Sequence, residues 1–121
     1  ADVLIHTICD ALLGAANLGD IGKHFPDTDP KYKGIDSKIL LSSVMNLIRE
    51  KGYELGNIDS TICLQKPKIG PYIAEMQKVL ASCMGVNQDL VSIKATTTEK
   101  LSFVGREEGV SAYATVLIQK N

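Results

Sequence analysis

Residues 57–95, NIDSTICLQKPKIGPYIAEMQKVLASCMGVNQDLVSIKA, decide the fold of this 121-residue chain. Residues 57–65 are predicted to form a strand, because Ile58, Ile62 and Leu64 are separated by even numbers of positions and so face the same side of a strand. Residues 70–84 follow a helical pattern that ends at Gly85, and residues 91–95 alternate again as a strand. A strand, a helix and a strand of these lengths favour a right-handed parallel crossover.

Hydrophobic periodicity predicts two further helices and one further strand. Apolar residues recur at helical spacing over residues 2–17, and again between Asp36, which can cap a second helix, and Gly52, which can stop it. Residues 18–35 form a long polar connection, and residues 110–119 alternate as a last strand. We expect an α/β (α+β) fold, a mixed β-sheet with helices packed on one face and ferredoxin-like or split βαβ character. Three strands are few for three helices, so we expect further strands from a neighbouring chain or from deleted sequence.

The composition predicts one soluble globular domain over residues 1–121. Hydrophobic residues make up 45% and charged residues 22% of the chain, which excludes disordered, collagen-like and coiled-coil proteins. No apolar run approaches the roughly 18 residues that a membrane helix needs. With 13 basic and 14 acidic residues the net charge is −1, whereas a broad nucleic-acid interface needs a clear basic excess. We therefore expect neither a membrane nor a nucleic acid as partner.

The three cysteines, Cys9, Cys63 and Cys83, are too scattered and too few for a zinc knuckle or a disulfide scaffold. We interpret them as small buried apolar side chains in a protein of a reducing compartment. No signal or transit segment is visible. The chain runs from Ala1 almost directly into a helical pattern, which is more typical of a fragment.

Asp2, His6 and Asp10 are spaced four residues apart, so all three project from one side of the first predicted helix. An imidazole between two carboxylates is a plausible metal ligand with supporting hydrogen bonds. Taken alone, a partly exposed polar stripe is the stronger interpretation, because one histidine is too few for a zinc site.

The run from Asp20 to Pro30, DIGKHFPDTDP, is dense in turn-forming residues and carboxylates. Asp and Pro dominate surface turns for purely local reasons, so a capped turn explains the run. A loop whose carboxylates accept hydrogen bonds from a polyol explains it equally well. Composition alone does not choose between the two.

Two polar clusters follow the strands of the predicted crossover. ATTTEK at residues 95–100 brings three hydroxyls and a carboxylate to a strand end, which suits phosphate oxygens and a divalent cation, although consecutive threonines are also good strand material. KPK at residues 66–68 places two ammonium groups before a helix, where they could meet an anion or only solvent. Because the two strands are predicted neighbours, their ends could converge on one ligand. No Gly-x-Gly-x-x-Gly or phosphate-loop motif is present, so a standard nucleotide-binding fold is not indicated.

Several motifs together resemble the 2-C-methyl-D-erythritol 2,4-cyclodiphosphate synthase family of non-mevalonate isoprene biosynthesis. Four of them occur in the family's order and spacing: DALLGAA (10–16), LGDIGK (18–23), FPDTD (25–29) and KATTTEK (94–100). Further agreement comes from KGY (51–53), GNID (56–59), QKPK (65–68) and FxGR (103–106). The resemblance covers essentially the whole chain.

The resemblance implies a lyase reaction, in which the 2-phosphate of 4-diphosphocytidyl-2-C-methyl-D-erythritol 2-phosphate attacks the β-phosphorus and expels CMP. It also implies a homotrimer with an active site at each subunit interface, and two bound metals, Zn²⁺ and either Mg²⁺ or Mn²⁺. Carried over by position, His6 would be a zinc ligand. Glu99 would hold the second cation between the α- and β-phosphates, and Thr97 would steady the pentavalent transition state.

The resemblance also implies the residues that contact the substrate. Those that would bind the methylerythritol part are Asp20, Ile21, Gly22, Phe25, Pro26, Asp27, Thr28 and Asp29. Those that would cradle the cytidine diphosphate are Leu64, Gln65, Lys66, Pro67, Lys68, Ile69, Gly70, Thr96, Thr97 and Thr98. Phe103 and Arg106 match two further positions that contact ligand in the family.

The sequence departs from the family's pattern at its start. The family has a glycine-rich segment with Asp-x-His, which supplies two more zinc ligands, and then His-Ser before the first helix; neither lies in this chain. Asp2 matches the last Asp of that segment, so the chain offers one of three zinc ligands and lacks the opening strands. We expect truncation, which also fits the thin predicted sheet.

Two other functions stay open beside the cyclase. One is a non-catalytic trimeric scaffold fragment that keeps a cytidine pocket. The other is a metal-dependent phosphohydrolase, which would use water as the nucleophile and release a linear product. For the cyclase we expect a bacterial cytoplasmic location or a plastid-type organelle.

Overall fold

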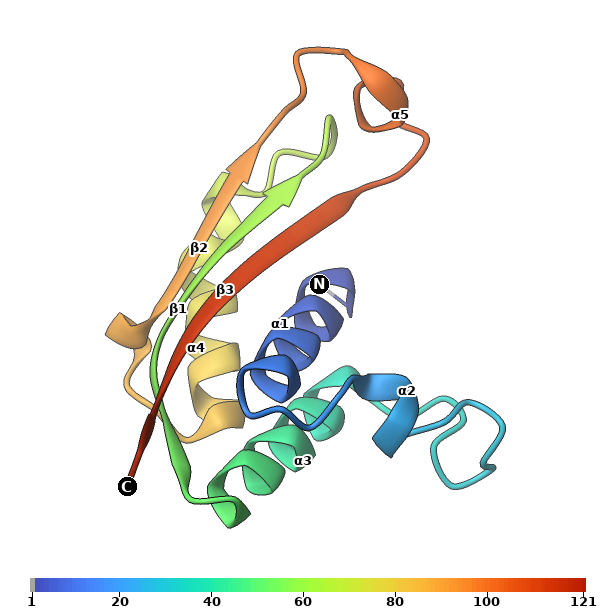
Figure 1. Cartoon of the computed structure of the whole chain (residues 1–121). Helices are drawn as coiled ribbons and strands as arrows, with labels where there is room; N and C mark the ends of the chain where they lie inside the picture. The colour runs from blue at the N-terminus through green and yellow to red at the C-terminus, as the bar shows by residue number, and fades with distance from the viewer. Residues whose placement is uncertain (1) are drawn as a thin grey trace.

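The computed structural model describes residues 2–121, and the side chain of Asp2, which the sequence placed beside His6, lies outside the described part. The chain forms a sheet and a layer of helices, with a single-turn helix on each of two long connections (Figure 1). In chain order the elements are α1 (Asp2–Ala15), α2 (Ile21–His24), α3 (Ser37–Glu50), β1 (Tyr53–Cys63), η1 (Gly70–Tyr72), α4 (Ile73–Met84), η2 (Gln88–Leu90), β2 (Val91–Thr96), α5 (Ser102–Gly105) and β3 (Ser111–Lys120).

The three strands form one mixed sheet in the order β2-β1-β3. β1 runs parallel to β2, with Ile58 opposite Val91, and antiparallel to β3, with Ile58 opposite Val116. The predicted parallel crossover and mixed sheet are confirmed. β1 and β2 are direct neighbours, as predicted. No strand of the described residues lies between them, so the sheet lacks the split βαβ character that was also expected.

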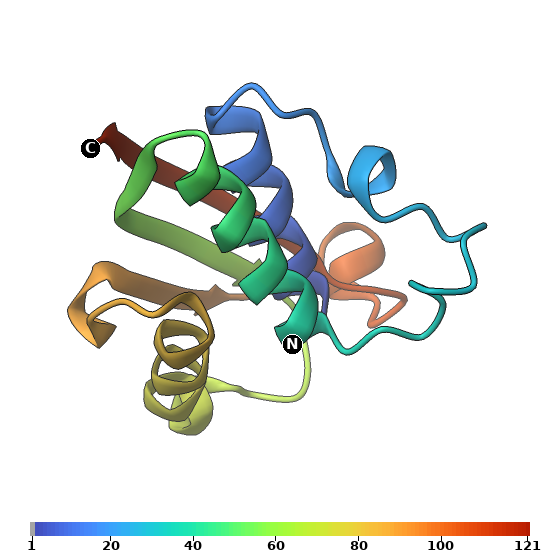
Figure 2. The ribbon, with the colours of Figure 1, turned by 90° about the horizontal axis from the view of Figure 1, so that it is seen from below.

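The helices α1, α3 and α4 pack on the same face of the sheet (Figure 2). α1 lies mainly over β3 and against α3, while α4 lies beside β2. The core between the layers is made of side chains that are almost fully buried, among them Ile8, Leu12, Leu41, Val44 and Ile58. The expected one-sided α/β packing is therefore confirmed, and the other face of the sheet is left uncovered by helices.

Local signals place the ends of the longer helices. The Asp36 side chain accepts a hydrogen bond from the Lys38 N–H at 2.8 Å and caps α3, as predicted. Gly85 ends α4 with φ 67° and ψ 40°, the left-handed conformation that glycine adopts without a steric penalty. Among the helices that the structure describes, none is long and apolar enough to cross a membrane.

Three sequence predictions need correction. β1 begins at Tyr53 rather than at residue 57, because a bulge between Leu55 and Asn57 shifts the register and breaks the simple alternation. The connections after α1 and β2 each contain a helical turn, α2 and α5, which are too short to produce a helical period. The alternation predicted over residues 91–95 ends before Ala95, which is exposed like its neighbour Lys94, although Val91 and Ile93 are buried.

The predicted burial of the cysteines is confirmed for Cys9 and only in part for Cys63 and Cys83. Cys9 is completely buried, while Cys63 and Cys83 are half-buried, and all three are free thiols. Burial raises the pKa of Cys9 to about 12, and the neighbouring Asp10 carboxylate adds to this effect. Cys9 is thus an unreactive apolar group of the core.

The burial of Ile58 predicts a large loss of stability on truncation. Its side chain is 0% exposed at the centre of β1, so Ile58→Ala should lower the free energy of unfolding by about 2–5 kcal/mol. Ile39→Ala is the matched control on α3, since Ile39 is 58% exposed, and it should change stability by less than about 0.5 kcal/mol. Urea unfolding followed by circular dichroism measures both, and equal losses would contradict the proposed core.

A second prediction concerns Arg49, which ties together the ends of α3, β1 and α4. Its guanidinium donates to both Glu54 carboxylate oxygens at 2.9 and 3.0 Å and to the Met84 carbonyl at 2.7 Å. The hydrogen bonds from Arg49 are the main reason why the pKa of Glu54 lies below its ordinary value of 4.5. A lowered pKa stabilises the fold above about pH 4.5, and this contribution disappears as the pH falls through the pKa of the folded state.

Glu54→Gln should therefore lower the free energy of unfolding by about 1 kcal/mol at pH 7, because the pair is about one-third exposed and partly screened. The difference from the wild type should shrink on going from pH 7 to a pH below the folded-state pKa of Glu54, where the carboxyl is protonated in both states. Urea unfolding at both pH values measures it, with Glu75→Gln on the exposed side of α4 as control. A difference that is the same at both pH values would contradict the role of the ion pair.

Candidate functional site

Two segments meet where the parallel strands β1 and β2 end. We call them the proline loop, residues 64–71, and the threonine turn, residues 97–101. The Leu64 N–H donates to the Thr96 carbonyl at 3.0 Å, which continues the β1–β2 pairing into the site. A hollow of about 320 Å³ opens mainly between the proline loop and the end of β2, and Thr97 is the residue of the threonine turn in its lining. The lining residues are Leu64, Gln65, Pro67, Lys68, Ile69, Gly70, Pro71, Ile73, Ala95, Thr96 and Thr97. The hollow is thus lined by eight of the ten residues that the resemblance assigns to the cytidine diphosphate.

Side chains join the proline loop to the segments that follow β2. The Gln65 amide oxygen accepts a hydrogen bond from the Lys100 backbone N–H at 3.2 Å. The Lys66 ammonium lies 3.5 Å from the Glu107 carboxylate, which ties the loop to the end of α5. Two positions predicted to contact ligand, Phe103 and Arg106, belong to α5 or follow it directly, so they lie at the same end of the sheet (Figure 1).

The charges and hydroxyls of this end suit a phosphorylated ligand. Lys66, Lys68 and Lys100 are exposed around the hollow, and Thr97 and Glu99 are exposed on the threonine turn. Ammonium groups and hydroxyls bind phosphate oxygens, and a carboxylate beside them can share a divalent cation with a diphosphate. Apolar side chains of the proline loop line the remainder of the hollow and can pack against a flat ring.

The segment predicted to bind a polyol is held by contacts of its own. The Asp20 carboxylate accepts from the Lys23 N–H at 3.0 Å and caps α2, and Asp29 accepts from the Lys31 N–H at 3.0 Å. These bonds are the local turn contacts that the simpler interpretation required. Asp27 and Thr28 are exposed between them. The simpler interpretation is therefore confirmed for Asp20 and Asp29, and polyol binding by Asp27 and Thr28 stays a prediction.

α2 and the loop after it lie far from the threonine turn within one chain. Figure 1 places α5 and the orange connection before it at the top of the molecule, and α2 with its following loop lower down, beside α1 and α3. The positions predicted to bind one substrate are therefore divided between two separate regions of this chain.

The predicted metal ligands do not form a cluster within the chain. His6 is exposed on α1, and no group of three or more His, Cys, Asp or Glu residues that could hold a metal occurs among the residues the structure describes. The described residues therefore do not fit a zinc site on their own. Glu99 fits a different cation, since Mg²⁺ is commonly held by one or two carboxylates together with substrate phosphates.

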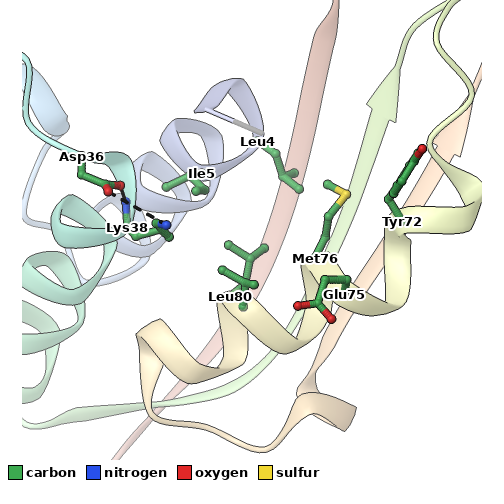
Figure 3. A pocket seen from close by; sticks show the side chains of 9 residues that line it. Leu4, Ile5, Asp36, Lys38, Tyr72, Glu75, Met76 and Leu80 are labelled. Atoms are coloured by element: carbon green, nitrogen blue, oxygen red, sulfur yellow. Dashed lines mark hydrogen bonds and ion pairs between the residues drawn. The ribbon is translucent and has the colours of Figure 1, made fainter.

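A larger hollow of about 390 Å³ opens elsewhere, between the first turns of α1 and α3 and one side of α4 (Figure 3). Its lining is mostly apolar, with Leu4, Ile5 and Leu80 pointing into it and the Asp36–Lys38 pair at its rim. It contains none of the predicted site residues. The hollow at the strand ends is therefore the better candidate site.

Two structural contacts were not predicted from the sequence, although it singled out Asp10 beside His6. The Asp10 carboxylate on α1 accepts from the Ile21 N–H at 2.9 Å and so anchors α2. Gly105 is buried against the backbone of Lys100. Asp10 belongs to the DALLGAA motif and Gly105 to the FxGR motif. The motifs could indicate that both residues are important, but the spacing of residues could not show which residue each one contacts.

Comparison with known proteins agrees with the arrangement of these motifs. The sequence pattern of the YgbB family matches residues 1–119. The 2-C-methyl-D-erythritol 2,4-cyclodiphosphate synthase of Parabacteroides distasonis is 67% identical over 120 residues, which cover 99% of this chain and 74% of that protein. The enzyme of the same name from Porphyromonas gingivalis is 66% identical over 98% of this chain and 73% of its own length.

Solved structures show the same fold. The bifunctional IspDF of Campylobacter jejuni superimposes with a TM-score of 0.94 at 43% identity, over 98% of this chain and 32% of that one. A 2C-methyl-D-erythritol-2,4-cyclodiphosphate synthase in a CDP-bound form gives a TM-score of 0.86 at 36% identity, over 95% of this chain and 74% of that one. The chain therefore belongs to the YgbB family of 2-C-methyl-D-erythritol 2,4-cyclodiphosphate synthases.

Proposed function

We propose that this protein takes part in isoprene precursor biosynthesis as a metal-dependent phosphorus–oxygen lyase. It would convert 4-diphosphocytidyl-2-C-methyl-D-erythritol 2-phosphate to 2-C-methyl-D-erythritol 2,4-cyclodiphosphate and CMP. The observation that carries this proposal is the shared hollow of the proline loop and the threonine turn, in a chain whose relatives bear the name of that synthase. A bacterial cytoplasmic setting stays a prediction.

In the proposed reaction an oxygen of the 2-phosphate forms a bond to the β-phosphorus, and the bond from that phosphorus to the bridging oxygen breaks. The bridging oxygen and its electron pair leave with CMP, so no water is consumed. Such a transfer needs in-line positioning and charge neutralisation more than covalent help from the protein. Because nucleophile and electrophile belong to one molecule, holding the substrate in a bent shape supplies much of the acceleration.

Each part of the site has a task in this scheme. The proline loop would hold the cytosine and ribose against its apolar side chains, and the exposed Lys66 and Lys68 would offset phosphate charge. Thr97 would donate its hydroxyl hydrogen to the equatorial oxygens of the β-phosphorus as charge builds there. That hydrogen is available, since the Thr97 oxygen serves as acceptor for the Glu99 N–H at 3.2 Å.

Glu99 would hold Mg²⁺ or Mn²⁺ through its exposed carboxylate. A divalent cation bound there supplies positive charge to the α- and β-phosphates and makes CMP a better leaving group. His6 is assigned to zinc only by the resemblance, because the described residues provide no further ligand beside it. No step of the proposed reaction depends on that assignment.

The division of the substrate contacts between two regions supports a site completed by a second copy of the chain. Asp20 to Asp29 of one subunit would then face the threonine turn of another, as the resemblance to a homotrimer implies. The sheet face that lacks helices carries two large apolar side chains, Tyr113 at 64% and Leu117 at 61% exposure. Apolar groups exposed on a flat, uncovered sheet are typical of an interface between subunits.

The central test of the proposed function is a ³¹P NMR assay of the substrate with Mg²⁺. The wild type should release CMP and form the cyclic diphosphate. Glu99→Gln should turn over at least about 100-fold more slowly, because the cation that would offset the developing negative charge loses its carboxylate ligand. The melting temperature should stay unchanged, since Glu99 is exposed. Glu75→Gln on α4 removes a carboxylate outside the site and should keep wild-type activity.

The same assay in H₂¹⁸O separates the alternatives. Cyclisation leaves ¹⁸O out of both products, whereas a phosphohydrolase would place it in a linear product. Tight binding of CDP without any turnover would favour the scaffold function. Unimpaired CMP release by Glu99→Gln would remove Glu99 from the proposed mechanism.

The subunit arrangement gives a separate prediction. The wild type should have a molar mass in solution of three times the chain mass of 13.1 kDa. The double variant Tyr113→Lys, Leu117→Lys should shift this value towards the mass of one chain, because charged groups on the uncovered sheet face repel a partner. Light scattering after size exclusion measures this, with Ile39→Lys on α3 as the control of equal exposure. A wild type that is strictly monomeric would contradict the shared site.

A further inference from the structure

The backbone of the threonine turn adopts an unfavourable conformation at the residue that would hold the cation. Glu99 has φ 52° and its neighbour Lys100 has φ 66°. Side chains with a Cβ rarely occupy this left-handed region, and each such residue costs about 1–3 kcal/mol unless its surroundings enforce it. Two consecutive residues of this kind need contacts that hold them.

One such contact comes from the proline loop. The Gln65 amide oxygen accepts the Lys100 backbone N–H at 3.2 Å, although the two residues are 35 positions apart. Within the turn, the Glu99 N–H donates to the Thr97 hydroxyl at 3.2 Å, and the Leu101 N–H donates to the Thr98 carbonyl at 3.0 Å. The bond to Gln65 is thus the one among these that ties the left-handed pair to another part of the fold.

A second contact comes from α5. A Cβ added to Gly105 would lie 2.1 Å from the carbonyl carbon of Lys100 and 2.6 Å from its Cα. These atoms are backbone, so a side chain at position 105 cannot be accommodated by a rotamer change. The Gly105 N–H also donates to the Leu101 carbonyl at 2.9 Å. The missing side chain of Gly105 lets α5 press directly on the turn.

We propose that Gln65 and Gly105 are positioning residues for Glu99. Gln65 holds the Lys100 N–H from one side and Gly105 packs on the Lys100 backbone from the other, so the left-handed pair keeps one conformation. The Glu99 carboxylate is thereby held at a constant place for the cation and diphosphate. This inference rests on the proposed function, and it gives Gln65 a role through its contact with the turn rather than through the substrate.

The test compares CDP affinity without metal and with Mn²⁺, by calorimetry and by Mn²⁺ electron paramagnetic resonance. Mn²⁺ should raise the CDP affinity of Gln65→Leu and of Gly105→Ala by a factor about tenfold smaller than in the wild type. This difference corresponds to about 1.4 kcal/mol of turn stability. For Gly105→Ala, which lies outside the lining of the hollow, the metal-free CDP affinity should change by less than about threefold, since that affinity does not use Glu99. Gly14→Ala, whose added Cβ meets nothing within 4 Å, and Gln88→Leu on η2 are the matched controls.

A double-mutant cycle distinguishes positioning from simple pocket lining. Glycine at position 100 adopts the left-handed conformation without a penalty, so Gln65→Leu should cost less in a Lys100→Gly background than in a Lys100→Ala background. Equal costs in the two backgrounds would overturn the proposal, as would wild-type Mn²⁺ dependence in Gln65→Leu. If Gly105→Ala does not fold, Gln65→Leu and the cycle decide the question.

Failure of the proposed function has a different signature. If the wild type binds no CDP with or without Mn²⁺, the nucleotide assignment falls, and amide hydrogen exchange of residues 99 and 100 then tests the positioning. Faster exchange at these two amides in Gln65→Leu, with an unchanged melting temperature, supports the proposal that Gln65 fixes the conformation of the threonine turn. Unchanged exchange at both amides contradicts it.

Discussion

The pairing of β1 along both of its edges is the constraint on which the rest of the structure depends. β1 runs parallel to β2 and antiparallel to β3, and its inward-facing Ile58 and Ile62 form part of the core beneath the helices. A slip of one residue would turn these side chains to the uncovered face, so register and core specify each other. The same register ends β1 beside β2 and brings Leu64 to Thr96, where the candidate site begins.

The site follows from this geometry because loops at the ends of neighbouring parallel strands emerge side by side. The proline loop follows one strand and the threonine turn follows the other, and their contacts link positions far apart in the chain. Phosphoryl transfer depends on fixed positions of charged groups. A turn held from two sides by Gln65 and Gly105 meets that need better than a loop that is free to move.

Parts of this arrangement could be predicted because their signals are local. The helical stripes of α1 and α3, the cap at Asp36 and the left-handed stop at Gly85 depend on residues within a few positions of one another. The bulge beside Leu55 and the single turns α2 and α5 could not, since a bulge interrupts the alternation and a four-residue helix has no period to detect.

By itself the sequence determined the longer elements, the kinds of side chain at the strand ends and the family to which the chain belongs, since all of these reside in short motifs and periodicities. Only the tertiary structure decided that β1 is the central strand, that the proline loop and the threonine turn share one hollow, and that α2 lies apart from them. It also decided that Gly105 packs on Lys100. The physical reason is that periodicity shows which side of an element is buried but not which element covers it, and contacts across 35 residues depend on the register of the whole sheet.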